Sequence, residues 1–137
     1  MKAILLSIPF IFSLSVLRAQ ETKAPNVGFV TIQQNDAGCS FSRIGDKFNN
    51  VLIDDASAGP WINIDGKDVK LEKLENTTPE KLKEKTIFRY KIGKIRVTLT
   101  LDLVSQGGEG GVAYKGEMVV TRGAKKAVLM IEGGCGC

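Results

Sequence analysis

The sequence predicts a small all-β domain, an antiparallel β-sandwich or small barrel of about eight strands. The strongest observation is an unbroken alternation of apolar and polar residues over 95–103, which is typical of a long, half-buried antiparallel strand. A second is Asp65-Gly66, a dipeptide favoured in tight hairpin turns, which stands between two alternating runs. No long helical pattern accompanies them.

Residues 1–19 are typical of a secretory signal peptide. Lys2 supplies a positive start, the following run is apolar apart from serines and Pro9, and Ala19 offers a small residue for cleavage. The run is short for a membrane span and is interrupted by Pro9, so a retained membrane anchor is the less favoured alternative. We expect the mature chain, residues 20–137, to be a single β domain that is periplasmic or extracellular and has no stable membrane insertion.

The first half of the mature chain predicts short strands. We expect them at 27–33, 40–43 and 51–53, where β-branched and aromatic residues cluster. The runs 61–64 and 68–71 form the hairpin around Asp65-Gly66. Between them and the preceding strand, 54–60 is a loop by composition. The charged segment 76–85 is either a short helix with Thr78 as its cap or a loop.

The second half is strongly β in character. The run 87–92 places Phe88, Tyr90 and Ile92 on one face, and 95–103 has its apolar residues on one face in the same way. A glycine-rich loop is expected at 107–111. The runs 112–121 and 124–131 then pair across Arg122-Gly123.

Composition excludes several classes of function. The chain has no histidine, which removes Ser-His-Asp and Cys-His catalysis and imidazole metal sites. Loss of Lys2 and Arg18 with the signal peptide leaves 17 basic and 15 acidic residues, a smaller excess than nucleic-acid binders usually carry. No phosphate-binding Gly-Lys-Ser/Thr motif is present. We therefore expect no enzymatic activity, no cofactor and no nucleic-acid partner.

The three cysteines are Cys39, Cys135 and Cys137. In an exported protein they predict one disulfide and one spare thiol. Pairing Cys39 with either Cys135 or Cys137 would close a loop of roughly 100 residues. A Cys135–Cys137 bridge would instead be a strained, easily reduced pair, and all three thiolates together would suit Cu(I) or Zn(II). The sequence favours a structural disulfide to Cys39 and leaves its partner open.

Loops on a rigid β scaffold are the expected place for function. Asp54 and Asp55 precede Trp61 in one predicted loop region, 54–61, and 105–113 contains another. We expect a non-catalytic exported binding or structural module that binds or inhibits another protein through such loops. The alternative is a thiol-based metal-binding or redox protein that uses Cys135 and Cys137.

Two stretches resemble known proteins. The run 61–71, with the early Gly-Cys and the Cys-Gly-Cys ending, resembles a group of small exported bacterial all-β proteins, and this resemblance implies no particular activity. The stretch from Gly111 through Tyr114 to Arg122-Gly123 is similar to the end of the periplasmic c-type lysozyme inhibitor family, which has a small β-barrel fold. That family places a serine where Gly110 stands and a lysine where Arg122 stands, and both reach into the lysozyme cleft.

Overall fold

The chain folds into one antiparallel β-sheet. The computed structural model describes residues 23–74, 85–106 and 111–136, and these contain nine strands and no helix. The predicted signal peptide, 76–84 of the charged segment, 107–110 and Cys137 lie outside the described residues. The strands are β1 (Gly38–Arg43), β2 (Asn50–Asp55), β3 (Gly59–Ile64), β4 (Lys67–Lys70), β5 (Glu72–Lys73), β6 (Thr86–Ile92), β7 (Ile95–Gln106), β8 (Val112–Arg122) and β9 (Lys125–Gly136). The predicted all-β class is confirmed.

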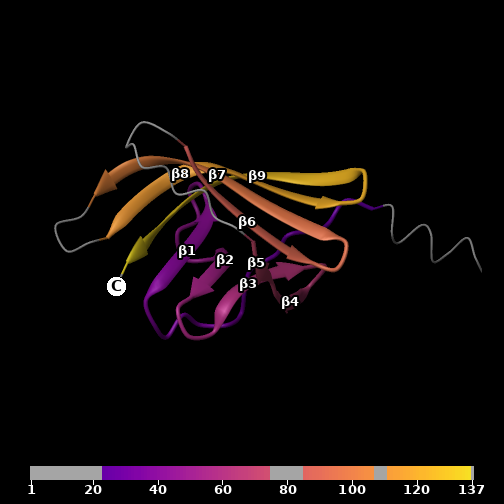
Figure 1. Cartoon of the computed structure of the whole chain (residues 1–137), viewed down its shortest axis with the longest axis horizontal. Coiled ribbons are helices and arrows are strands. Elements are labelled where there is room, and N and C mark those ends of the chain that lie inside the picture. The colour runs from indigo at the N-terminus through magenta and orange to yellow at the C-terminus, as the bar shows by residue number, and fades with distance from the viewer. Residues whose placement is uncertain (1–22, 75–84, 107–110, 137) are drawn as a thin grey trace, which may run out of the picture.

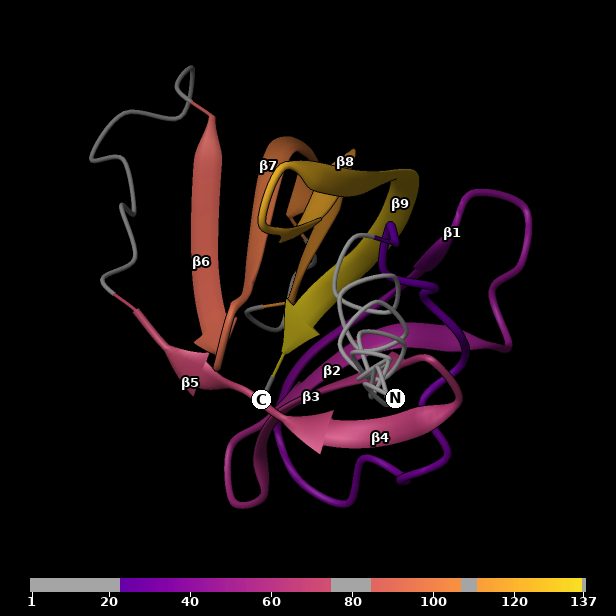
Figure 2. The ribbon, with the colours of Figure 1, turned by 90° about the vertical axis from the view of Figure 1, so that its right-hand side faces the viewer.

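The sheet curls into a nearly closed barrel. Its order is β4-β3-β2-β1-β9-β8-β7-β6-β5, so the first strand pairs with the last (Figure 1). Only Leu71 separates β4 from β5, although β4 pairs with β3 and β5 pairs with β6. The Leu71 amide donates to the Pro60 carbonyl at 2.8 Å, and the Leu74 amide donates to the Arg89 carbonyl at 2.9 Å. One bent strand therefore joins the two edges of the sheet, and Figure 2 shows the strands following one another around the barrel.

The barrel interior is filled with apolar side chains from alternating positions. On β7, Val97, Leu99 and Leu101 are fully buried, as the period-2 pattern predicts. Phe41 reaches across the barrel to Phe88, with 6.4 Å between ring centroids, and Phe88 meets Tyr114 edge-on at 6.4 Å. The predicted inward faces of 87–92 and 95–103 are thus confirmed, and apolar side chains from several strands pack together in the barrel interior.

The prediction of a first strand at 27–33 is wrong. This segment makes a single bridge, Val27 to Ile64, and belongs to a longer stretch, residues 26–36, which we call the strap and which crosses the outside of the barrel. The Val30 amide donates to the Asn50 carbonyl at 2.8 Å. Beneath the strap, Val51 and Ile53 are at most 2% exposed although they alternate with the inward-facing positions of β2. The strap is hydrogen-bonded to Asn50, next to Val51, so we attribute the burial of this face of β2 to the strap, which covers it without joining the sheet.

The prediction of a loop over 54–60 is also wrong. Asp54 and Asp55 are the last residues of β2, and Gly59 and Pro60 are the first of β3, so the turn is confined to 56–58. Register explains the difference, because Asp54 pairs with Cys39 on one side and with Pro60 on the other. Pairing on both sides extended the strand through residues whose composition is typical of loops.

The predicted hairpin at Asp65-Gly66 is confirmed. Asp65 has φ 53° and Gly66 has φ 85°, the pair of positive values that a tight turn of this kind requires. The turns 65–66, 93–94 and 123–124 all lie at one end of the barrel because successive strands alternate in direction. We call this the turn end, and it is where the chain also enters the barrel at Val27.

Candidate functional site

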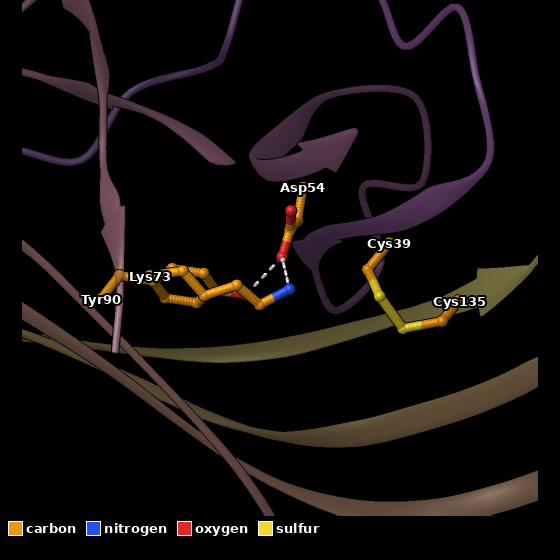
Figure 3. The surroundings of a disulfide bond; sticks show 5 residues. All are labelled: Cys39, Asp54, Lys73, Tyr90 and Cys135. Atoms are coloured by element: carbon orange, nitrogen blue, oxygen red, sulfur yellow. Dashed lines mark hydrogen bonds and ion pairs between the residues drawn. A yellow bond between two sulfur atoms is a disulfide. The ribbon is translucent and has the colours of Figure 1, made fainter. Parts of the chain in front are cut away.

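The disulfide joins Cys39 of β1 to Cys135 of β9. The two residues are direct register partners with their Cα atoms 4.0 Å apart (Figure 3). The predicted structural disulfide is therefore present, and the structure selects Cys135 as the partner. The predicted last strand ends at residue 131, whereas β9 continues to Gly136. Most of the Gly-Gly-Cys-Gly-Cys ending is therefore strand. Pairing with β1 brings the sulfurs of Cys39 and Cys135 together.

Asp54 faces the barrel interior beside the disulfide. Its Oδ2 accepts a hydrogen bond from the Tyr90 hydroxyl at 3.0 Å and lies 3.0 Å from Nζ of Lys73 (Figure 3). Burial, followed by the negative charge of Asp54 and the hydrogen bond to it, raises the pKa of Tyr90 far above its ordinary value. Tyr90 is therefore a permanent hydrogen-bond donor, and its role here is to satisfy a buried carboxylate.

Asp55 closes the β2–β3 turn and anchors the strap. Its carboxylate accepts five hydrogen bonds, from the amides of Asn35, Asp36, Ser57 and Ala58 and from the Ser57 hydroxyl, at 2.8–3.0 Å. The bonds from Ala58 and Ser57 hold the pKa of Asp55 well below its ordinary value. This predicted binding residue is 3% exposed, and its acceptor capacity is used inside the protein.

The two aromatic candidates are also built into the scaffold. Trp61 lies in β3 rather than in a loop, and its Nε1 donates to the Ala58 carbonyl at 3.0 Å. Tyr114 packs against Phe88. Tyr114 and Arg122 are eight residues apart on β8, about 26 Å along an extended strand, so only Arg122 reaches the turn end.

Arg122 forms an ion pair with Asp65 across the turn end. Burial opposes the charge on Asp65, but the hydrogen bonds from the Arg122 side chain and the Asn26 amide outweigh it and lower the pKa of Asp65. The pair links the β3–β4 turn to the end of β8 and lines a cavity of about 1300 Å³. We call this the turn-end cavity.

The turn-end cavity has a basic rim and an apolar floor. Lysines at four positions join Arg122 in its lining, namely Lys23, Lys67, Lys94 and Lys125. Among the residues that the structure describes, Asp65 is the only acidic group lining it. The floor is formed by Ile64, Val69, Ile92 and Ile95. Of the predicted site residues, only Arg122 belongs to this cavity, and no motif in the sequence indicated the rest.

Three aspartates hold the strap through its backbone amides. Asp65 accepts from the Asn26 amide at 3.0 Å, Asp68 from the Thr31 amide at 3.1 Å, and Asp55 from the Asn35 and Asp36 amides as described. Burial opposes the charge on Asp68, but hydrogen bonds from Thr31 and Asn63 outweigh it, so its pKa is lowered. Carboxylate acceptors thus replace the regular strand pairing that the strap lacks.

Replacing Asp68 with asparagine is expected to lower the free energy of unfolding at pH 7 by about 1 kcal/mol, because charge-assisted hydrogen bonds at a partly exposed site are lost. The folded-state pKa of Asp68 lies below the unfolded value of about 3.9. Its contribution is therefore complete above that pH and is lost as the pH falls through the folded-state pKa. Thermal unfolding followed by circular dichroism should show the difference from the unmodified protein shrinking in acid.

Asp102→Asn is the matched control for this prediction. The Asp102 side chain is 66% exposed and faces Lys85 at 3.7 Å, a surface pair of little energetic value. Replacing Asp102 with asparagine should leave the melting temperature nearly unchanged, both at pH 7 and in acid. Equal effects of the two substitutions would contradict the assigned role of Asp68.

Comparisons with protein-family models, with curated proteins and with solved structures each found no match. Within residues 23–74, 85–106 and 111–136, no helix is long and apolar enough to cross a membrane, and no three His, Cys, Asp or Glu side chains are grouped to hold a metal ion. The function must therefore be inferred from this chain's own residues and their arrangement.

Proposed function

We propose that this protein is an exported binding module without catalytic activity, which engages an anionic partner through its turn end. The observation that carries the proposal is the turn-end cavity, where the described lining residues include five basic side chains and one carboxylate. Opposite charge favours association and raises its rate. Elsewhere the barrel interior is packed, so this concave end of the barrel is suited to receive a partner.

The acidic candidates support a scaffold role rather than catalysis. Oδ2 of Asp54 is engaged by Tyr90 and Lys73, and both oxygens of Asp55 accept hydrogen bonds, five in all. A general base or nucleophile requires a lone pair that can be directed at a substrate. Both carboxylates instead stabilise the end of β2 and what surrounds it.

The test is a titration of the mature protein with polyglutamate, an acidic polypeptide, followed by amide chemical shifts. Resonances of the turns 65–66, 93–94 and 123–124 are expected to move. Lys125→Glu, on the rim, should weaken binding about tenfold or more, whereas Lys115→Glu, an exposed lysine of β8 away from the cavity, should not. Shifts confined to other surfaces, or equal effects of the two variants, would remove the proposal.

A narrower version is inhibition of a c-type lysozyme, which the resemblance around Tyr114 and Arg122 suggests and in which Arg122 would act from the turn end. Under this version lysozyme activity should fall in proportion to the added protein. Unchanged lysozyme activity at high molar excess would remove this version and leave the binding module in place.

A further inference from the structure

We infer that the turn-end cavity binds an amphipathic anion, an alkyl or acyl chain carrying a phosphate or carboxylate head. This rests on the proposed function and names the ligand class of the same site. Basic residues alone would suit any anion. The further observation is that the rim surrounds an apolar floor rather than a polar one.

The floor is made of β-branched side chains that the fold leaves partly uncovered. Val69, Ile92 and Ile95 pack against the core from its edge and remain partly exposed, while Ile64 beneath them is 6% exposed. Ile64, Ile92 and Ile95 lie at strand ends beside hairpin turns, and Val69 lies two residues beyond Lys67 on β4. Covering such surface with the chain of a ligand is favourable by the hydrophobic effect.

The head group is placed by the cations of the rim. Lys67 follows the β3–β4 turn and Lys125 follows the β8–β9 turn, so they approach the cavity from two different hairpins. Arg122 lies beside Lys125 and is held by Asp65. The lysine ammonium groups supply mobile point charges suited to a phosphate or carboxylate, and the Arg122–Asp65 pair keeps the two hairpins in place.

The shape of the site favours binding of a single small ligand molecule rather than docking against a flat surface. The cavity is concave, and its volume of about 1300 Å³ exceeds that of many small-ligand sites. The buried side chains Val97 and Val120 fill the barrel beyond it, so the chain would lie across the floor and not enter the interior. The inferred ligand is therefore short or only partly enclosed.

The test compares octyl phosphate with inorganic phosphate and octyl glucoside, using calorimetry and amide chemical shifts on the mature protein. Octyl phosphate is expected to bind about a hundredfold more tightly than inorganic phosphate. Burial of a few methylene groups of the octyl chain contributes enough binding free energy for a difference of this size. Octyl glucoside, with the same chain and no charge, should bind at least tenfold more weakly than octyl phosphate.

Two substitutions separate the contributions of head and chain. Lys125→Gln should weaken octyl phosphate and inorganic phosphate alike, with Lys115→Gln as the control that changes neither. Val69→Thr keeps the side-chain shape and should reduce only the advantage of the octyl chain. Because Val69 is partly exposed, this variant is expected to fold, and its melting temperature provides the check.

The outcomes distinguish this inference from the proposed function. If octyl phosphate binds no better than inorganic phosphate while polyglutamate still shifts the turn-end resonances, the amphipathic ligand is wrong and the binding module stands. If no anion shifts those resonances, both are wrong. Binding to phosphatidylglycerol vesicles without binding to monomeric octyl phosphate would assign the turn end to a membrane surface and overturn the inference.

Discussion

Removing the disulfide, by replacing Cys39 and Cys135 with alanine, is expected to lower the free energy of unfolding by about 4.7 kcal/mol. The bridge spans 96 residues of sequence, so it greatly restricts the unfolded chain. In the folded state it connects β1 and β9, the first and last strands, which pair in the middle of the sheet and join its N-terminal and C-terminal strands. Guanidinium unfolding of both proteins without reductant, followed by circular dichroism, measures the difference.

Cys137→Ala is the matched control and should leave the unfolding midpoint unchanged. The denatured protein should show one reactive thiol of its three cysteines, and a peptide map should link Cys39 to Cys135. Three reactive thiols together with a bound soft metal ion would contradict this assignment. That result would favour the alternative of a thiol-based metal-binding or redox protein.

Phe41→Ala is expected to cost about 3–5 kcal/mol of unfolding free energy, the range for removal of a buried aromatic side chain. Phe41 is fully buried, contacts Phe88 across the barrel and lies opposite Gly133. A Cβ on Gly133 would meet the Phe41 ring at 2.8 Å, so the aromatic side chain fills the space that the glycine leaves. Without the ring, an unfilled cavity would remain in the middle of the barrel.

Phe48→Ala removes the same side chain from a site that is 97% exposed, and it is expected to change stability by less than about 0.5 kcal/mol. Chemical denaturation of the two variants side by side tests the assignment of the core. A loss at Phe48 as large as that at Phe41 would show that the loop 44–49 contributes to stability in a way that its exposure does not indicate.

The candidate site was the part least accessible from the sequence. Asp54 and Asp55 attracted attention as adjacent carboxylates near Trp61, yet the fold uses them in opposite directions, one into the barrel and one toward the strap. Lys73 and Tyr90 had no sequence signal as partners of Asp54. Tyr90 and Asp54 are 36 residues apart on β6 and β2, which do not pair, and only the curling of the sheet into a barrel brings them together.

The sequence by itself determined the β class, the hairpin at Asp65-Gly66 and the inward faces of β6 and β7. These follow from alternation and turn chemistry, which act between neighbours along the chain. The tertiary structure alone decided that Cys39 pairs with Cys135, that 27–33 is a strap, and that the basic residues of four separate segments surround one cavity. Those features depend on which strands lie side by side and in which register, and the pattern within any single strand does not contain that information.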